Sequence, residues 1–126
     1  MAARWIVADT SIWIDHINKG DAELAAQLKR RRIVLHPMII GEVALGSLAN
    51  RQLALEELGV LPSVKRASHG EFMEMIERLG LFNKGIGYVD AHLLASARLT
   101  PGTFLWTRDK RLRAIAERLE VSATFK

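Results

Sequence analysis

The most informative features of this sequence are two short apolar runs near its opposite ends. Arg4 to Ala8 and Thr103 to Trp106 have the length and the β-branched and aromatic content of buried strands. An aspartate follows each run, Asp9 directly and Asp109 after a short connection. The long stretch between the runs has helical patterns. The two strands are therefore expected to be parallel, because parallel strands need long crossover connections.

The rest of the chain alternates in the same way, which predicts an α/β domain over residues 1–126. Apolar spacing and helix-forming composition predict helices over Ser11–Asn18, Ala22–Arg32, Met38–Leu48, Arg51–Leu58, His69–Leu79, Tyr88–Leu99 and Lys110–Glu120. Three further short apolar runs are expected as strands: Ile33–His36, Leu61–Val64 and Val121–Phe125.

Composition excludes several classes of protein. The chain has no cysteine, so disulfides, thiolate metal ligands and cysteine nucleophiles are excluded. No apolar run approaches the ~18 residues that a membrane span needs, and the N-terminus lacks the apolar core of a signal peptide. We therefore expect a cytoplasmic protein with no membrane partner. The net charge of +4 favours a polyanionic partner.

Asp9 and Asp109 stand at the positions where α/β proteins place their functional groups. Ligands of open α/β sheets bind at the carboxyl ends of the strands. Each aspartate also precedes a predicted helix, where an N-cap is equally expected, and both interpretations stay open. Thr107 is placed either to share the capping of Asp109 or to orient the site.

Glu42 and Asp90 lie on predicted helices with apolar neighbours. Asp90 is three and four residues before Leu93 and Leu94, so it shares a face with side chains expected to pack on the core. We expect Glu42 likewise to point toward the sheet. A glutamate on such a helix is rarely buried without a partner, so burial there would indicate a site. The alternatives are a solvent-facing stripe for Glu42 and an interaction with the helix dipole for Asp90.

Taken together, the four acids suggest one site. Convergent carboxylates raise one another's pKa unless a cation is present. Hard oxygen ligands of this kind suit Mg²⁺ or Mn²⁺, and such sites commonly use one or two ions to hydrolyse phosphodiesters. The basic remainder of the chain would then attract the phosphate backbone of a nucleic acid.

Other signals carry less information. Basic residues close to the acids are candidates for phosphate contacts: Lys84, Arg108, Lys110, Arg111 and Arg113. The run Arg30-Arg31-Arg32 is interpreted as a solvated charge cluster at a helix end. The sequence has neither a phosphate-loop motif nor a zinc-ligand spacing.

The ordered motifs resemble those of PIN-domain ribonucleases, and most closely those of the VapC toxins of bacterial toxin–antitoxin pairs. The resemblance runs from Arg4 to Phe125. It rests on Asp9-Thr10-Ser11, on Glu42 after Pro37-Met38-Ile39-Ile40-Gly41, on Gly87-Tyr88-Val89-Asp90-Ala91, and on Trp106-Thr107-Arg108-Asp109-Lys110-Arg111-Leu112.

This resemblance implies a three-layer α/β/α fold with a central parallel sheet of four or five strands. It implies Mg²⁺ or Mn²⁺ at Asp9, Glu42, Asp90 and Asp109, with Thr10, Ser11 and Thr107 supporting the metal or the phosphate. The implied activity is endonucleolytic hydrolysis of structured RNA, either tRNA or ribosomal RNA. The implied partners are a second copy of the chain and a cognate VapB-like antitoxin that blocks the site.

Other functions remain as alternatives. An α/β phosphatase with Asp9 as nucleophile would want a second aspartate two residues later, where Ser11 stands. A receiver-like signalling domain would need a paired acid beside Asp9. A non-catalytic RNA-binding module without a metal ion would not be expected to place four carboxylates opposite the negatively charged phosphates of RNA.

Overall fold

Strand β1 (Trp5–Ala8) pairs in parallel with strand β2 (Thr103–Trp106) in the computed structural model, which describes residues 4–125. The register places Ile6 opposite Phe104 and Ala8 opposite Trp106. Both predicted strands and their parallel arrangement are therefore confirmed. Because the two strands run in the same direction, their carboxyl ends lie side by side at one edge of the sheet.

Three further extended segments reach these strands through single backbone bridges. The bridges are parallel and join Ile6 to Ile33, Leu35 to Ser63, and Leu105 to Ser122. Each segment makes too few backbone pairs to continue as a regular ladder. The expected sheet of four or five strands is not confirmed, since within residues 4–125 only β1 and β2 form continuous strands.

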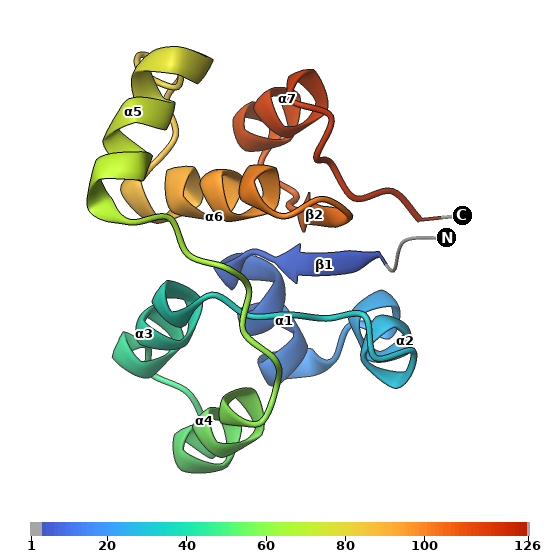
Figure 1. The fold of residues 1–126 in the computed structure, drawn as a ribbon. Helices are drawn as coiled ribbons and strands as arrows, with labels where there is room; N and C mark the ends of the chain where they lie inside the picture. The colour runs from blue at the N-terminus through green and yellow to red at the C-terminus, as the bar shows by residue number, and fades with distance from the viewer. Residues whose placement is uncertain (1–3, 126) are drawn as a thin grey trace.

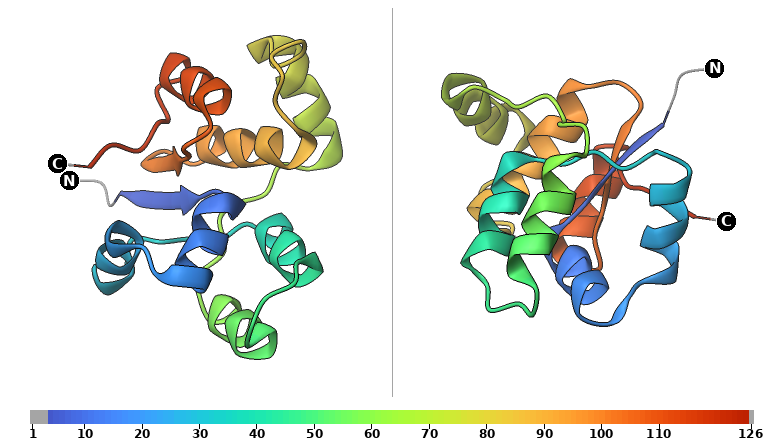
Figure 2. Two further views of the ribbon diagram at one scale, coloured as in Figure 1. Left: turned by 180° about the vertical axis from the view of Figure 1, so that it is seen from behind. Right: turned by 90° about the horizontal axis from the view of Figure 1, so that it is seen from below.

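Helices lie on both sides of the strands (Figure 1). On one side are α5, α6 and α7, and on the other are α1, α2, α3 and α4. Their bounds are α1 Thr10–Lys19, α2 Ala22–Lys29, α3 Pro37–Leu45, α4 Arg51–Gly59, α5 His69–Leu79, α6 Tyr88–Leu99 and α7 Lys110–Arg118. The views from behind and below show the same arrangement, with α3 and α4 side by side (Figure 2).

All seven predicted helices are present in the described part of the chain, and α5 and α6 have the predicted bounds. Helices α2, α3 and α7 end earlier than expected. After α2, Arg31 adopts a φ of 57°, which lies in the left-handed region and not in that of a right-handed α-helix, and the chain turns there toward Ile33. Helix α3 ends at Gly46, whose extended backbone stops the helix before Leu48.

Helix α6 forms the centre of the core and holds one acid near its start. Its residues Ala91 to Ala97 are all buried, and it packs against β2. A helix buried for two turns has little freedom to move, so Asp90, which precedes the buried run, is held firmly. In the described residues, no helix is long and apolar enough to span a membrane.

Candidate active site

Asp9 follows β1 and is the N-cap of α1. Its side chain is 5% exposed, and one carboxylate oxygen accepts hydrogen bonds from the Ile12 amide (3.2 Å) and the Ser11 hydroxyl (2.7 Å). The other oxygen accepts a hydrogen bond from the Thr107 hydroxyl, just beyond β2. These three donors satisfy a carboxylate that would otherwise be costly to bury. Asp9 therefore caps a helix and also faces the end of the neighbouring strand.

Thr107 links the ends of the two strands. Its buried hydroxyl donates to Asp9 and accepts a hydrogen bond from the Asp109 amide (3.1 Å). Asp109 is the N-cap of α7, and its Oδ1 atom accepts from the Arg111 amide (2.9 Å) and the Leu112 amide (3.1 Å). Capping uses only one carboxylate oxygen of Asp109, so the exposed second oxygen is left for another ligand.

Glu42 lies on the exposed side of α3, so the expectation that its side of the helix packs against the sheet is wrong. The fully buried residues of this helix are Ile39 and Val43, and they occupy the core-facing positions instead. The Glu42 carboxylate nevertheless reaches α1, where it accepts a hydrogen bond from the Thr10 hydroxyl. Since Thr10 follows Asp9 in the chain, this bond holds Glu42 close to the end of β1.

Asp90 is half-buried in the first turn of α6. Burial is the largest cause that raises its pKa, and together with the negative charges of Asp9, Asp109 and Glu42 it brings the pKa from the usual 3.8 to about 6. Four acids from different parts of the sequence therefore share one electrostatic field. A bound cation relieves repulsion of this kind.

The carboxylate oxygens of the four acids are ligands that suit a hard divalent cation, although in this structure they do not surround one point. Within residues 4–125, no three acidic or histidine side chains are placed to enclose an ion. Hydrogen bonds direct Asp9 toward Thr107 and Glu42 toward Thr10, and like charges keep the groups apart. Negatively charged oxygen donors are the ligands that Mg²⁺ and Mn²⁺ prefer.

Arg108 is already engaged by acids of α1 and α2. Its guanidinium forms ion pairs with Asp15 (3.2 Å) and Asp21 and lies 5.6 Å from the centre of the Trp106 ring. These hydrogen-bonded acids raise the pKa of Arg108. Asp15 and Asp21 are distant from Arg108 in sequence, and no local pattern connects them. An RNA phosphate would have to compete with both carboxylates for this side chain.

The other basic residues expected near RNA are less constrained. The Arg111 side chain packs against the backbone at Gly85, in the loop before α6. Lys84 and Lys110 are exposed, and neither forms an ion pair with a described residue. The structure therefore leaves these two lysines accessible to solvent near the elements that carry Asp90 and Asp109.

Comparison with known proteins identifies the class to which this fold and site correspond. The family model for the PIN domain matches residues 6–118, and the chain belongs to that family. Ribonuclease VapC32 of Mycobacterium tuberculosis, found in two strains, is 42% identical over 109 residues, covering 86% of this chain and 88% of its own length. The VapC-type resemblance expected from the sequence is confirmed.

Proposed function

We propose that the chain is a metal-dependent endoribonuclease that hydrolyses phosphodiester bonds in structured RNA such as tRNA or ribosomal RNA. The observation that carries this proposal is the half-buried Asp90 carboxylate, whose pKa is raised first by burial and then by the negative charges of Asp9, Asp109 and Glu42. A relative of 42% identity bears the name ribonuclease. Four neighbouring carboxylates would repel an RNA backbone unless a cation stood between them and the phosphates.

In this proposal Asp9, Glu42, Asp90 and Asp109 hold Mg²⁺ or Mn²⁺. When bound, the ion supplies positive charge that stabilises developing negative charge on phosphate oxygens and lowers the pKa of a water molecule. The chain itself supplies the positioning. The Thr107 hydroxyl orients Asp9 while its oxygen fixes the Asp109 backbone, and Thr10 holds Glu42 toward the same end of β1.

Ser11 keeps the Asp9 carboxylate in a fixed direction. Its hydroxyl donates to the Asp9 oxygen that also caps α1. Thr10, Ser11 and Thr107 therefore act as positioning residues in the proposed site. Solvent-exposed Lys84 and Lys110, together with Arg108 and Arg111, are proposed to contact the phosphates that flank the scissile bond.

We also propose that the chain is the toxin of a type II toxin–antitoxin pair, acts in the cytoplasm and is inhibited by a VapB-like antitoxin. A homodimer is proposed as its assembled form. Exposed apolar side chains on and beside α3 and α4 support a protein contact, since Leu45 is 90% exposed, Val60 83% and Leu53 53%. Size-exclusion chromatography with light scattering tests the dimer.

RNA cleavage tests the catalytic proposal. The purified protein should cleave total RNA with Mg²⁺ or Mn²⁺ and stop when EDTA is added. Asp90→Asn should reduce the rate by at least a hundredfold, because an amide is a poor substitute for a charged metal ligand. The matched control is Glu74→Gln, which neutralises an exposed acid on α5 and should cleave like the parent. Undiminished cleavage in EDTA or by Asp90→Asn contradicts the proposal.

A non-catalytic RNA-binding module is the alternative outcome of the same experiment. It would bind RNA and leave it intact in every buffer. The phosphatase alternative is disfavoured by the contact of Ser11 with Asp9, because a neutral hydroxyl occupies the place of the second aspartate.

A further inference from the structure

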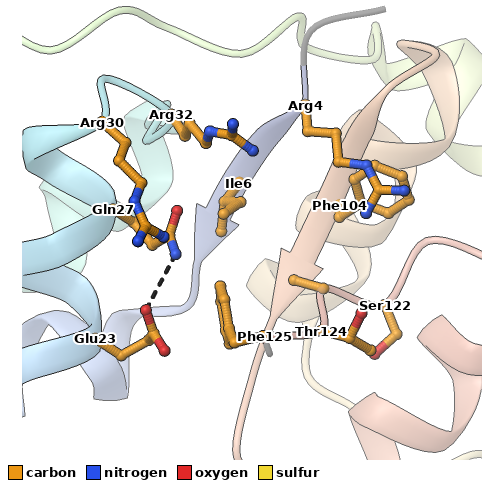
Figure 3. A pocket seen from close by; sticks show the side chains of 11 residues that line it. Arg4, Ile6, Glu23, Gln27, Arg30, Arg32, Phe104, Ser122, Thr124 and Phe125 are labelled. Atoms are coloured by element: carbon orange, nitrogen blue, oxygen red, sulfur yellow. Dashed lines mark hydrogen bonds between the residues drawn. The ribbon is translucent and has the colours of Figure 1, made fainter. Parts of the chain in front are cut away.

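A pocket of about 250 Å³ opens beside β1 and β2 (Figure 3), and its described lining includes none of the four acids of the candidate site. Its floor contains Ile6 and Phe104, which are paired in the strand register. One wall comes from α2 and the segment after it, and the other from the chain that follows α7. The pocket therefore lies over a part of the sheet that helices leave open.

Arginine side chains give this pocket a positive charge. Arg4, Arg30 and Arg32 all line it, and none forms an ion pair with a described residue. Among the described residues of the lining, the only acid is Glu23, which accepts a hydrogen bond from the side-chain amide of Gln27 (3.0 Å). Three guanidinium groups against one carboxylate leave an excess of positive charge. Arginine in such a setting suits phosphate, because its planar fork donates two parallel hydrogen bonds.

Aromatic side chains stand among these arginines. The Arg4 guanidinium lies 5.4 Å from the centre of the Phe104 ring, and the side chains are adjacent in Figure 3. Phe125 lines the same pocket and packs edge-on against Trp106, with ring centres 4.7 Å apart. Phe104 and Phe125 are only partly buried. Proteins that bind single-stranded nucleic acids combine a positive groove with exposed aromatic rings on which bases stack.

We infer that this pocket binds a phosphate of a single-stranded RNA segment, with Arg4 and Arg32 on the phosphate and Phe104 available to a base. The inference rests on the proposed ribonuclease function and adds a second contact point for its substrate. Arg4 precedes β1 and Asp9 follows it, so the Cα atom of Arg4 in the pocket and the Cα atom of Asp9 in the acid cluster are about 17 Å apart at ~3.3 Å per strand residue. An RNA strand that occupies both the pocket and the carboxylate site would be bound at two points, with the pocket holding it some distance from the bond that lies at the carboxylates.

Binding of a fluorescent single-stranded RNA, followed by anisotropy in EDTA over a series of KCl concentrations, tests this inference without requiring cleavage. The variant Arg4→Gln/Arg32→Gln should bind about tenfold more weakly, since hydrogen bonds to charged groups are strong. The slope of log affinity against log salt should fall by about 0.7, because both arginines hold one phosphate and each single-strand phosphate contact contributes ~0.7. Phe104→Leu should weaken binding and leave this slope unchanged.

The control variant Lys19→Gln/Arg78→Gln removes the same charge from exposed positions outside the pocket and should bind nearly as the parent does. Urea unfolding of each variant establishes that it is folded. Equal losses of RNA affinity in the two double variants overturn the inference. An unchanged salt slope in Arg4→Gln/Arg32→Gln also overturns it. Saturable binding of inorganic phosphate without RNA binding also overturns it, since the pocket would then be an anion site only.

The outcomes separate this inference from the proposed function. If the parent binds RNA through the arginines and never cleaves it, the ribonuclease proposal fails and the binding pocket stands. If Arg4→Gln/Arg32→Gln cleaves and binds like the parent, the pocket assignment fails and the ribonuclease proposal stands. If both proposals hold, this variant has a raised KM on long RNA and an unchanged kcat.

Discussion

Replacing Asp90 with asparagine should stabilise the metal-free protein while removing its activity. A pKa raised from 3.8 to about 6 means that the charged carboxylate is less favourable in the folded state than in the unfolded chain. A shift of this size corresponds to about 3 kcal/mol, at 1.36 kcal/mol per pKa unit. Asp90 is half-buried, so solvent screening reduces the expected effect to roughly 1–2 kcal/mol.

The sign of the effect depends on pH. Below the unfolded-state pKa, Asp90 is protonated in both states and carries no penalty. As the pH rises from about 4 to about 6, the unfolded state ionises first, and the parent loses stability relative to Asp90→Asn. Above about pH 6 the difference is constant. The variant should therefore be more stable by roughly 1–2 kcal/mol at about pH 7.5 and nearly equal to the parent at about pH 4.

Urea unfolding in EDTA at the two pH values measures this difference. Glu74→Gln is the control and should stay within about 0.5 kcal/mol of the parent at both. Added Mg²⁺ should stabilise the parent more than Asp90→Asn, since binding to the folded state stabilises it by mass action. If Asp90→Asn is no more stable than the parent in EDTA near pH 7.5, burial and charge repulsion do not destabilise the ionised Asp90 carboxylate, and the reasoning is refuted.

Three further outcomes are expected. Thr107→Val leaves an oxygen of buried Asp9 and the Asp109 amide without their shared partner, so it should lower the free energy of unfolding by about 1–3 kcal/mol and also reduce cleavage; Thr107→Ser should restore both. The His36 pKa is lowered from 6.5 to about 4 by burial and by the nearby charges of His92 and Arg66, so His36 should remain neutral at about pH 5.5 in an NMR titration, and the fold should lose stability as the pH falls from about 6.5 to about 4, where the unfolded state alone takes up the proton. Gly85→Ala should lower the melting temperature, at a cost of about 1 kcal/mol or more, because Gly85 has a φ of +75° and an added Cβ atom would lie 2.5 Å from an Arg111 nitrogen; an unchanged melting temperature would contradict the expected strain.

Much of the fold could be predicted because local patterns were strong. Helix α5 begins with a capping box between Ser68 and Glu71, and its bounds match those predicted from apolar spacing. The bounds of β2 were also predicted correctly, because its apolar run is short and ends at polar Thr107. Interactions within one turn or one strand determine these features, so the sequence alone contains them.

Features that depend on tertiary packing were harder to predict. Helix α3 is apolar on nearly all sides, so periodicity did not identify its buried face: Val43 is fully buried, whereas Leu45 is 90% exposed. Glu42 was consequently placed on the wrong side of the helix. The order of the four acids in sequence indicated a shared site, but only the folded chain shows which hydrogen bonds hold the carboxylates of Asp9, Glu42 and Asp109.

The arginine pocket was not predicted either. Arg30 and Arg32 were interpreted as part of a solvated charge run, and Arg4 was interpreted only as the start of a strand. The bridge between Ile6 and Ile33 brings Arg32 beside the start of β1, and β2 then contributes Phe104. No spacing rule connects these positions, since they meet only after strands from three parts of the chain come together.

The pairing of β1 with β2 also governs when the carboxylate site can exist during synthesis. Ile6 meets Phe104, so nearly the whole chain must leave the ribosome before Asp9 acquires its contact with Thr107. Contacts between such distant residues form late, because closing a long loop costs entropy before it yields any interaction. A nascent chain that ends before β2 would carry Asp9, Glu42 and Asp90 without the strand that gathers them. The protein is therefore expected to remain harmless to RNA around the ribosome until β2 has been translated.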